Sequence, residues 1–206
     1  MKQPLGVILA GGQATRMGGG DKGLLSLDGQ SILRHVIDRL EPQVAALALN
    51  ANGDPARFTD LDLPILPDSV AGFPGPLAGV LAGLDWAADR GADSIVTAAA
   101  DTPFFPEDLV PRLLLAAEGM AHPLALATTP DPRRGTVRHP TFGIWPVALR
   151  DDLREALARG TRKVVIWTEQ HGGREALFAT GAIDPFFNVN TPEDLVQARD
   201  MAKGAA

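Results

Sequence analysis

The chain opens with Leu5-Gly6-Val7-Ile8-Leu9-Ala10-Gly11-Gly12-Gln13-Ala14-Thr15-Arg16-Met17-Gly18-Gly19-Gly20-Asp21-Lys22-Gly23, an apolar run that ends abruptly in a glycine-rich loop. A continuous apolar run of this kind is typical of a strand buried on both faces, as in parallel sheets. Glycines directly after such a strand let the backbone approach a ligand closely and direct its N–H groups at phosphate oxygens. Arg16 and Lys22 add the full positive charges that a polyphosphate requires. The stretch therefore predicts a loop that binds the phosphates of a nucleotide.

Two better-known phosphate-binding loops fit this stretch poorly. A Walker A loop needs a lysine followed by a hydroxyl residue, whereas Lys22 is followed by Gly23. Gly18, Gly20 and Gly23 match the G-x-G-x-x-G pattern of dinucleotide-binding folds. In those folds the first glycine follows its strand at once, but Gly18 comes well after Ala10, so the match is weak. A glycine-rich surface loop without a ligand remains the alternative.

Composition limits the class of protein. The 206 residues suit one domain, 1–206, with a sizeable core. The formal net charge of −6 and the lack of a lysine/arginine run argue against a nucleic-acid partner. The chain has no cysteine, which excludes disulfides, thiolate metal sites and cysteine nucleophiles. No stretch reaches the ~18 apolar residues of a membrane span, and the N-terminus lacks a cleavable apolar signal, so we expect a soluble cytoplasmic monomer without a membrane partner.

Apolar runs alternate with amphipathic stretches along the rest of the chain. We expect helices at 32–40 (capped by Ser31), 148–159 and 162–170, and helices that begin at Pro76, Pro106 and Pro192. We expect strands at 44–49, 63–66, 94–100, 125–129, 141–145 and 176–179, and a mobile proline- and arginine-rich loop at 130–138. This alternation predicts an α/β protein, a Rossmann-like three-layer α/β/α domain with a mostly parallel sheet.

Residues capable of chemistry follow the early strands. The glycine loop comes after Ala10, and Asn50, Asp68 and Asp101 each end a predicted strand. Because ligands of open α/β sheets bind outside the carboxyl ends of the strands, we expect these groups to share one site. Asp101 is followed by Thr102-Pro103 and suits Mg²⁺, which takes few protein oxygens and completes its shell with phosphates. The alternative for Asp101 is a cap on the helix near Pro106.

Several further motifs have weaker assignments. Asn188 and Asn190 alternate along the chain and share a face, although Asn190 or Thr191 would also serve as a cap for the last helix. The loop that contains Gly75 and leads to Gly79 would let a helix N-terminus face an anion or a ribose, or would be a plain turn. His139 favours a place in a loop over a contact with the acceptor substrate, and neither His35 nor His171 has an evident partner. Arg162 and Lys163 would form either a basic face for an anionic acceptor or a solvated helix face.

The motifs, taken together and in order, resemble those of the MobA-type molybdenum cofactor guanylyltransferases, which join a nucleoside monophosphate to a phosphorylated acceptor. The resemblance covers nearly the whole chain. It is carried by Leu9-Ala10-Gly11-Gly12, Arg16-Met17-Gly18, Asp21-Lys22-Gly23, Asn50-Ala51-Asn52, the Gly75 to Gly79 loop, Asp101-Thr102-Pro103, His139-Pro140-Thr141 and Phe187-Asn188-Val189-Asn190-Thr191-Pro192.

The resemblance implies a fold, a set of site residues and a cofactor. The fold would be that of the nucleotide-diphospho-sugar transferases. Arg16, Lys22 and Asp101 would be catalytic, and Asp101, with help from Asn190, would hold Mg²⁺. GTP would be held by Leu9, Ala10, Gly11, Gly12, Lys22, Asn50, Asp68, Gly75, Gly79 and Asp101.

The implied reaction transfers GMP from GTP to the terminal phosphate of molybdopterin and releases pyrophosphate. Since the attacking phosphate is already anionic, no general base is required, and the site's task is to neutralise and position anions. The partners implied are the two substrates, proteins that deliver molybdopterin, and proteins of molybdoenzyme maturation.

The sequence leaves several alternative functions open. Cytidylyltransferases of the same superfamily resemble the chain but typically carry alanine at the position of Gly11 or Gly12, where glycine leaves room for the larger guanine. A sugar-phosphate nucleotidyltransferase would usually be longer. A dinucleotide-dependent oxidoreductase is disfavoured by the late glycine motif, and a catalytically silent nucleotide-binding regulator by the presence of Lys22 and Asp101.

Overall fold

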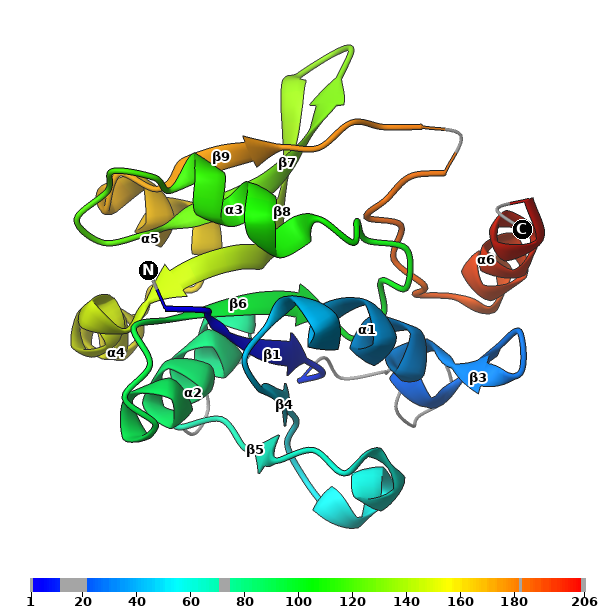
Figure 1. Ribbon diagram of the computed structural model, residues 1–206, viewed down its shortest axis with the longest axis horizontal. Coiled ribbons are helices and arrows are strands. Elements are labelled where there is room, and N and C mark those ends of the chain that lie inside the picture. Colours follow the sequence, from blue (N-terminus) through cyan, green and yellow to red (C-terminus); the bar gives the residue numbers. More distant parts are fainter. Residues whose placement is uncertain (1, 12–21, 71–74, 182, 205–206) are drawn as a thin grey trace.

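A seven-stranded sheet lies at the centre of the protein in a computed structural model, which describes residues 2–11, 22–70, 75–181 and 183–204 (Figure 1). Its strands lie in the order β5-β4-β1-β6-β8-β7-β9. They comprise β1 (Leu5–Leu9), β4 (Leu47–Asn50), β5 (Ile65–Leu66), β6 (Ser94–Ala99), β7 (Ala125–Asp131), β8 (Gly135–Pro146) and β9 (Arg174–Leu177). Strand β8 is antiparallel to both of its neighbours, and the other pairs are parallel, so the prediction of a mostly parallel sheet is confirmed.

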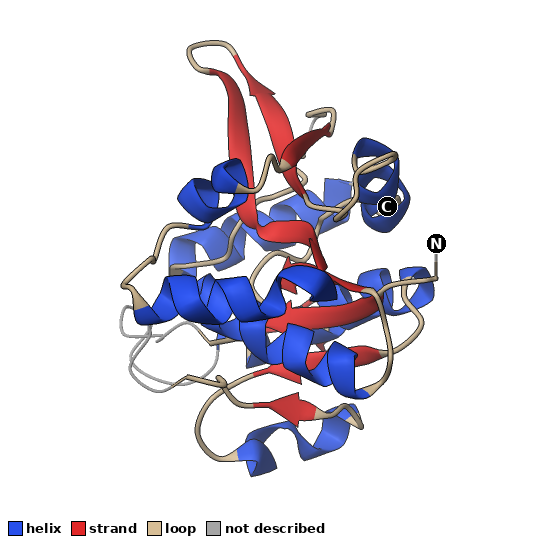
Figure 2. Ribbon diagram, turned by 90° about the vertical axis from the view of Figure 1, so that its left-hand side faces the viewer, coloured by secondary structure: helices blue, strands red, loops and turns tan. Residues whose placement is uncertain are grey.

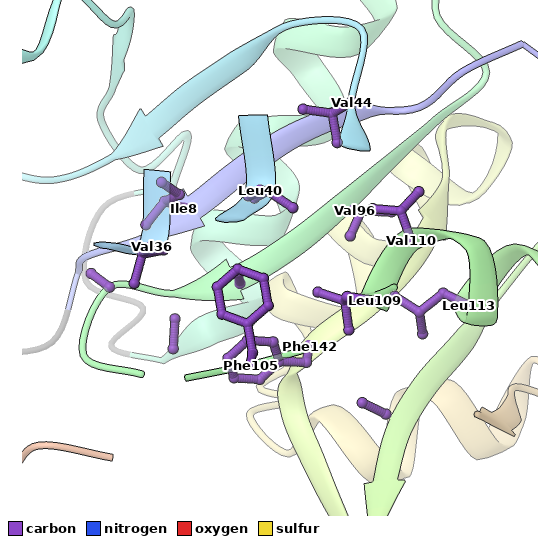
Figure 3. Packing of buried hydrophobic residues seen from close by; sticks show 14 of the residues in the cluster. Ile8, Val36, Leu40, Val44, Val96, Phe105, Leu109, Val110, Leu113 and Phe142 are labelled. Atoms are coloured by element: carbon purple, nitrogen blue, oxygen red, sulfur yellow. The ribbon is translucent and has the colours of Figure 1, made fainter. Parts of the chain in front are cut away.

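Helices cover both faces of this sheet. Strand β1 is buried along its whole length, and its successive residues Val7 and Ile8 belong to separate hydrophobic clusters because side chains alternate along a strand. The Ile8 cluster contains side chains of α1 and α3, which lie in front of the strands in Figure 1, and Figure 3 shows its packing. The Val7 cluster contains side chains of α2, α4 and α5. The three-layer α/β/α prediction is therefore confirmed. The helices are α1 (Ile32–Leu40), α2 (Pro76–Asp89), α3 (Leu109–Ala116), α4 (Arg150–Ala158) and α5 (Val164–Gln170).

Two of these helices, α1 and α2, begin where the sequence predicts, α4 and α5 begin two residues later than predicted, and the start predicted for α3 is wrong. Ser31 caps α1, because its Oγ accepts a hydrogen bond from Arg34 N at 3.1 Å. Helix α2 begins at Pro76, as predicted. The prediction for Pro106 is wrong, because α3 begins only at Leu109, after a turn in which Pro106 O accepts a hydrogen bond from Leu109 N at 3.1 Å.

The segment 130–138 also differs from the sequence prediction of a mobile loop. Thr129–Asp131 and Gly135–Val137 pair as antiparallel strands and form the end of β7 and the start of β8, which project from the body in Figure 2. The turn between them is held by Asp131 Oδ1, which accepts hydrogen bonds from Arg133 N at 2.9 Å and Arg134 N at 2.7 Å. Charged and proline residues are tolerated here because the ribbon carries them at its exposed end.

The C-terminal helix α6 (Pro192–Gly204) begins at the predicted proline and lies beside a small separate hairpin, β2 (Ser26–Leu27) with β3 (Gln30–Ser31) (Figure 1). Val189 and Ala198 pack with Leu27 in a third hydrophobic cluster. The end of the chain is thereby attached to the segment that directly follows the glycine-rich loop.

None of the helices in the described residues has the length and apolar character that a membrane span requires.

The parallel strands end level with one another, which creates the edge at which a site can form. Leu9 is paired with Asn50 of β4 and with Ala99 of β6, and Asn50 is paired with Leu66 of β5. Hydrogen bonds continue one residue past the strands, from Ala10 N to Asn50 O at 2.9 Å. The segments that follow these strands therefore emerge along the same edge of the sheet.

Candidate active site

Asn50 and Asp68 form the first half of the site. Asn50 is the last residue of β4 and is 2% exposed. Its Nδ2 donates hydrogen bonds to Leu66 O and to Asp68 Oδ1, both at 3.0 Å. A buried amide must be satisfied in this way, and the arrangement fixes the carboxylate of Asp68 against the end of the neighbouring strand. The two residues predicted from the strand ends are therefore in direct contact.

Two of the predicted glycines surround Asn50. A Cβ atom at Gly11 would lie 3.5 Å from Asn50 Oδ1, and one at Gly79 would overlap the same oxygen. Gly79 is buried in α2, so its place in the site is to make room for the Asn50 side chain. Gly75 is exposed at the start of α2 and has φ +142°, a conformation that a side chain would strain.

The main chain at the end of β1 is partly engaged within the sheet. Ala10 N–H donates to Asn50 O, and Leu9 O accepts a hydrogen bond from Ala100 N at 3.1 Å. A main-chain contact of Ala10 with a nucleotide would therefore use its carbonyl group. Gly12, predicted to bind the nucleotide, and Arg16, predicted to be catalytic at its phosphates, lie outside the described residues.

Asp101 lies at the far side of the same edge. It follows β6, and the start of α3 at Leu109 shows that it does not cap that helix. Thr102 is fully buried, and its Oγ1 lies 3.2 Å from Asp101 Oδ1 and 2.5 Å from Asn188 Oδ1. Burial raises the pKa of Asp101, while the hydrogen bond from Thr102 and the charge of Lys22 act in the opposite direction. The ionised carboxylate is thus poorly solvated and would be stabilised by a further cation.

Lys22 reaches across to the C-terminal segment. Its Nζ donates a hydrogen bond to Asn190 Oδ1 at 2.9 Å, over a sequence separation of 168 residues. Asn190 does not cap α6, because the Oγ1 of Thr191 accepts a hydrogen bond from Asp194 N at 3.2 Å. The carboxylate of Asp194 in turn accepts from the backbone N–H groups of Asn190 and Thr191, which lowers the pKa of Asp194. The cap therefore leaves the Asn190 side chain to Lys22.

Other residues singled out in the sequence have structural partners. His139 Nε2 lies 2.9 Å from Thr129 Oγ1, and its ring stacks on Phe186 at 4.1 Å, a packing in which burial lowers the histidine pKa. His171 contacts the carboxylate of Asp152 at 2.8 Å. His35 contacts the main chain at Leu27 O, and Arg162 contacts it at Leu157 O and Thr161 O, whereas Lys163 is exposed directly before α5.

Sequence reasoning missed Asn52 and Thr102 as parts of the site, and it placed Asn188 only on the same face as Asn190. Asn52 exchanges two hydrogen bonds with Asp68, and Asn188 contacts Thr102. Each of the three lies within two positions of a residue that was predicted, so the signal was present in the motifs Asn50-Ala51-Asn52, Asp101-Thr102-Pro103 and Asn188-Val189-Asn190.

The level strand ends bring the Asn50–Asp68 pair and two charged residues, Lys22 and Asp101, to one edge of an α/β sheet, the edge at which ligands of such sheets bind. A family model for the MobA-like NTP transferase domain matches residues 6–174, and the chain belongs to that family.

The chain is similar over nearly its whole length to proteins named molybdenum cofactor guanylyltransferase. The chain is 50% identical over 198 residues to a protein of Mesorhizobium japonicum named molybdenum cofactor guanylyltransferase, covering 94% of this chain and 93% of that protein. A protein of the same name from Cereibacter sphaeroides is 48% identical and is covered to 96%.

Solved structures share the fold. Molybdopterin-guanine dinucleotide biosynthesis protein A from Archaeoglobus fulgidus has a TM-score of 0.73 at 22% identity, over 97% of this chain and 99% of that one. 4-Diphosphocytidyl-2C-methyl-D-erythritol synthase from Anaerococcus prevotii has a TM-score of 0.75 at 14% identity, over 98% and 96%. At these identities the likeness shows the fold alone, and it confirms the predicted fold, that of the nucleotide-diphospho-sugar transferases.

Replacing Gly79 tests the packing of Asn50. Gly79→Ala places a methyl group on Asn50 Oδ1 and against Leu9, so the Asn50 amide must move. Overpacking of about 1–3 kcal/mol exceeds the ~0.5–1 kcal/mol that alanine gains over glycine in a helix, so we expect a net destabilisation. Chemical denaturation measures the stability, and the side-chain amide resonances of Asn50 report its position.

Gly83→Ala is the matched control for that variant. It lies one turn later in α2 and crowds only the apolar ends of Ile95 and Val7, each 2.8 Å from the added Cβ. We expect comparable destabilisation with the Asn50 amide resonances unchanged. Unshifted Asn50 resonances in Gly79→Ala would contradict the assigned packing.

Proposed function

We propose that this protein transfers GMP from GTP to the terminal phosphate of molybdopterin, which forms molybdopterin guanine dinucleotide and releases pyrophosphate. The observation that carries the proposal is one sheet edge at which a fixed carboxylate, Asp68, follows β5, and two charged residues, Lys22 and Asp101, follow β1 and β6. Such an edge offers one place for a base and another for phosphates. Relatives that are 46–50% identical over nearly the whole chain and named molybdenum cofactor guanylyltransferase support it.

Asp68 is the proposed contact for the base. Guanine presents two neighbouring donors, N1–H and the 2-amino group, and a carboxylate can accept from both. Cytosine offers a single amino donor beside acceptors, which a carboxylate does not complement. The proposal therefore assigns GTP rather than CTP as the substrate.

Asp101 and Asn190 are the proposed Mg²⁺ ligands. Both supply the oxygen atoms that Mg²⁺ prefers, and because burial raises the pKa of Asp101, a bound cation would stabilise its ionised carboxylate. In the described part of the chain, no three His, Cys, Asp or Glu side chains converge, so phosphate oxygens and water would complete the coordination shell. A bound Mg²⁺ ion would neutralise part of the negative charge on the phosphates.

The reaction then needs few groups from the protein. An oxygen of the terminal phosphate of molybdopterin forms a bond to the α-phosphorus of GTP, and the bond from that phosphorus to the bridging oxygen of the β-phosphate breaks. The electron pair leaves with pyrophosphate. Lys22 offsets negative charge on the phosphates, and in the same proposal Arg16 does so from the glycine-rich loop. Asn190 holds Lys22 in place before the substrate binds.

Removing either charged group tests the role of the Lys22–Asp101 group. We expect Lys22→Ala and Asp101→Ala to lower kcat on the order of 10²–10³-fold, by analogy with the loss of one preorganised charge-stabilising group. Steady-state turnover at saturating GTP and Mg²⁺ measures the effect. Lys203→Ala is the control, since Lys203 is exposed on α6 and pairs only weakly with Asp200 at 3.9 Å. Turnover near that of the unmodified protein in either variant would remove that residue from the mechanism.

A competition assay tests the function as a whole. The protein is incubated with Mg²⁺, molybdopterin carrying molybdate, and equal concentrations of GTP and CTP, and the pterin dinucleotides are identified by mass spectrometry. We expect the guanine dinucleotide. A cytosine dinucleotide would retain the reaction and overturn the base, whereas GTP binding without any dinucleotide would overturn the acceptor.

A further inference from the structure

Asn52 forms a reciprocal pair with Asp68 and has no role in the function proposed above. Asn52 Nδ2 donates a hydrogen bond to Asp68 Oδ2 at 2.8 Å, and Asp68 N donates to Asn52 Oδ1 at 2.9 Å. Asn50 Nδ2 donates to the other carboxylate oxygen, Asp68 Oδ1, at 3.0 Å. Each oxygen of Asp68 therefore receives one amide N–H from a different asparagine.

The backbone of Asn52 is itself anchored. Arg57 Nη2 donates to Asn52 O at 2.6 Å, and Arg57 Nε donates to Asp54 O at 2.9 Å. The guanidinium lies 5.0 Å from the ring centre of Phe58, which is buried. Gly53 has φ +86°, which allows the tight turn between Asn52 and Asp54. The Asn52 amide is thus presented from a turn that is attached to the core.

The hydrogen bonds from Asn50 and Asn52 constrain the plane of the Asp68 carboxylate. With one hydrogen bond from Asn50 alone, the carboxyl group of Asp68 could rotate about its Cβ–Cγ bond, a broad torsion. A second donor on the other oxygen, together with the backbone hydrogen bond to Asn52 Oδ1, fixes that rotation. Each carboxylate oxygen keeps capacity for one more hydrogen bond in the fixed plane. That remaining capacity matches two adjacent donors, as the N1–H and 2-amino group of guanine present them.

We propose that Asn52 is a positioning residue that sets the selectivity of the site for guanine, by holding Asp68 so that it accepts from the 2-amino group as well as from N1–H. This inference rests on the proposed function, in which Asp68 contacts the base. It concerns recognition of the base and not the transfer step, because Asn52 contacts Asp68 and not the Lys22–Asp101 group.

The test compares GTP with ITP, whose base lacks the 2-amino group. We expect Asn52→Ala to lower kcat/KM for GTP about tenfold, through KM, and to lower that for ITP much less, so that the preference for GTP over ITP falls. The kcat at saturating GTP should stay within about twofold of the unmodified protein. Asn52→Asp keeps the size of the side chain but replaces the donor with a second carboxylate beside Asp68, so its preference for GTP should fall at least as far.

The control is Thr59→Ala, which removes a hydrogen bond of similar exposure, Thr59 Oγ1 to Ala56 O at 2.8 Å, from the same local segment without contacting Asp68. Its GTP-to-ITP preference should be unchanged, and thermal unfolding of all variants shows whether each one folds.

Two outcomes would overturn the inference while the proposed function stands. One is guanine dinucleotide formation by Asn52→Ala with the GTP-to-ITP preference intact, whether kcat/KM is unchanged or falls equally for both nucleotides. The other is a fall in kcat at saturating GTP, which would show a merely structural role. If the unmodified protein forms no dinucleotide, the proposed function fails separately. Direct titration of GTP and ITP into the unmodified protein and Asn52→Ala then decides the inference by the same change in preference.

Discussion

The level ends of the parallel strands are the constraint on which the rest of the structure depends. Because Leu9 of β1 is in register with Asn50 of β4 and Ala99 of β6, the segments that follow all three strands emerge at one edge. Both faces of the sheet are covered by helices, so this edge is where polar groups can gather without being buried in the core. The consequence is a division of the site: amides and the Asp68 carboxylate after β4 and β5, and the Lys22–Asp101 group after β1 and β6.

The second half of the site is completed from the other end of the chain. Val189 N donates to Asp101 O at 2.8 Å, and Asn190 accepts from Lys22, so the segment before α6 holds the two charged residues from outside the sheet. Packing of α6 against the β2–β3 hairpin keeps that segment in place. The residues proposed to bind the phosphates therefore come from segments far apart in sequence. Their arrangement depends on tertiary packing and not on any one loop.

Much of this was predictable from the sequence, for identifiable physical reasons. Continuous apolar runs gave the buried parallel strands, and a polar residue that ends such a run must lie at the sheet edge, which is why Asn50, Asp68 and Asp101 were found. Strand β8 was predicted at only 141–145, because its exposed outer half lacks the apolar alternation of a half-buried strand. Pro106 was read as a helix start, since proline suits both the first turn of a helix and an isolated turn. Local motifs pointed to the positions of Asn52 and Asn190 but not to their partners, because their hydrogen bonds join residues 16 and 168 positions apart.

In the proposed function, one sheet edge binds the base at Asp68 and the phosphates at Lys22 and Asp101. A crystal structure of the protein with a non-hydrolysable GTP analogue and Mg²⁺ would place each of these groups. We expect the guanine N1–H and 2-amino group on the Asp68 carboxylate, the ion on Asp101, and Lys22 on the phosphates. A base bound away from Asn50 and Asp68, or an ion held by other side chains, would contradict it.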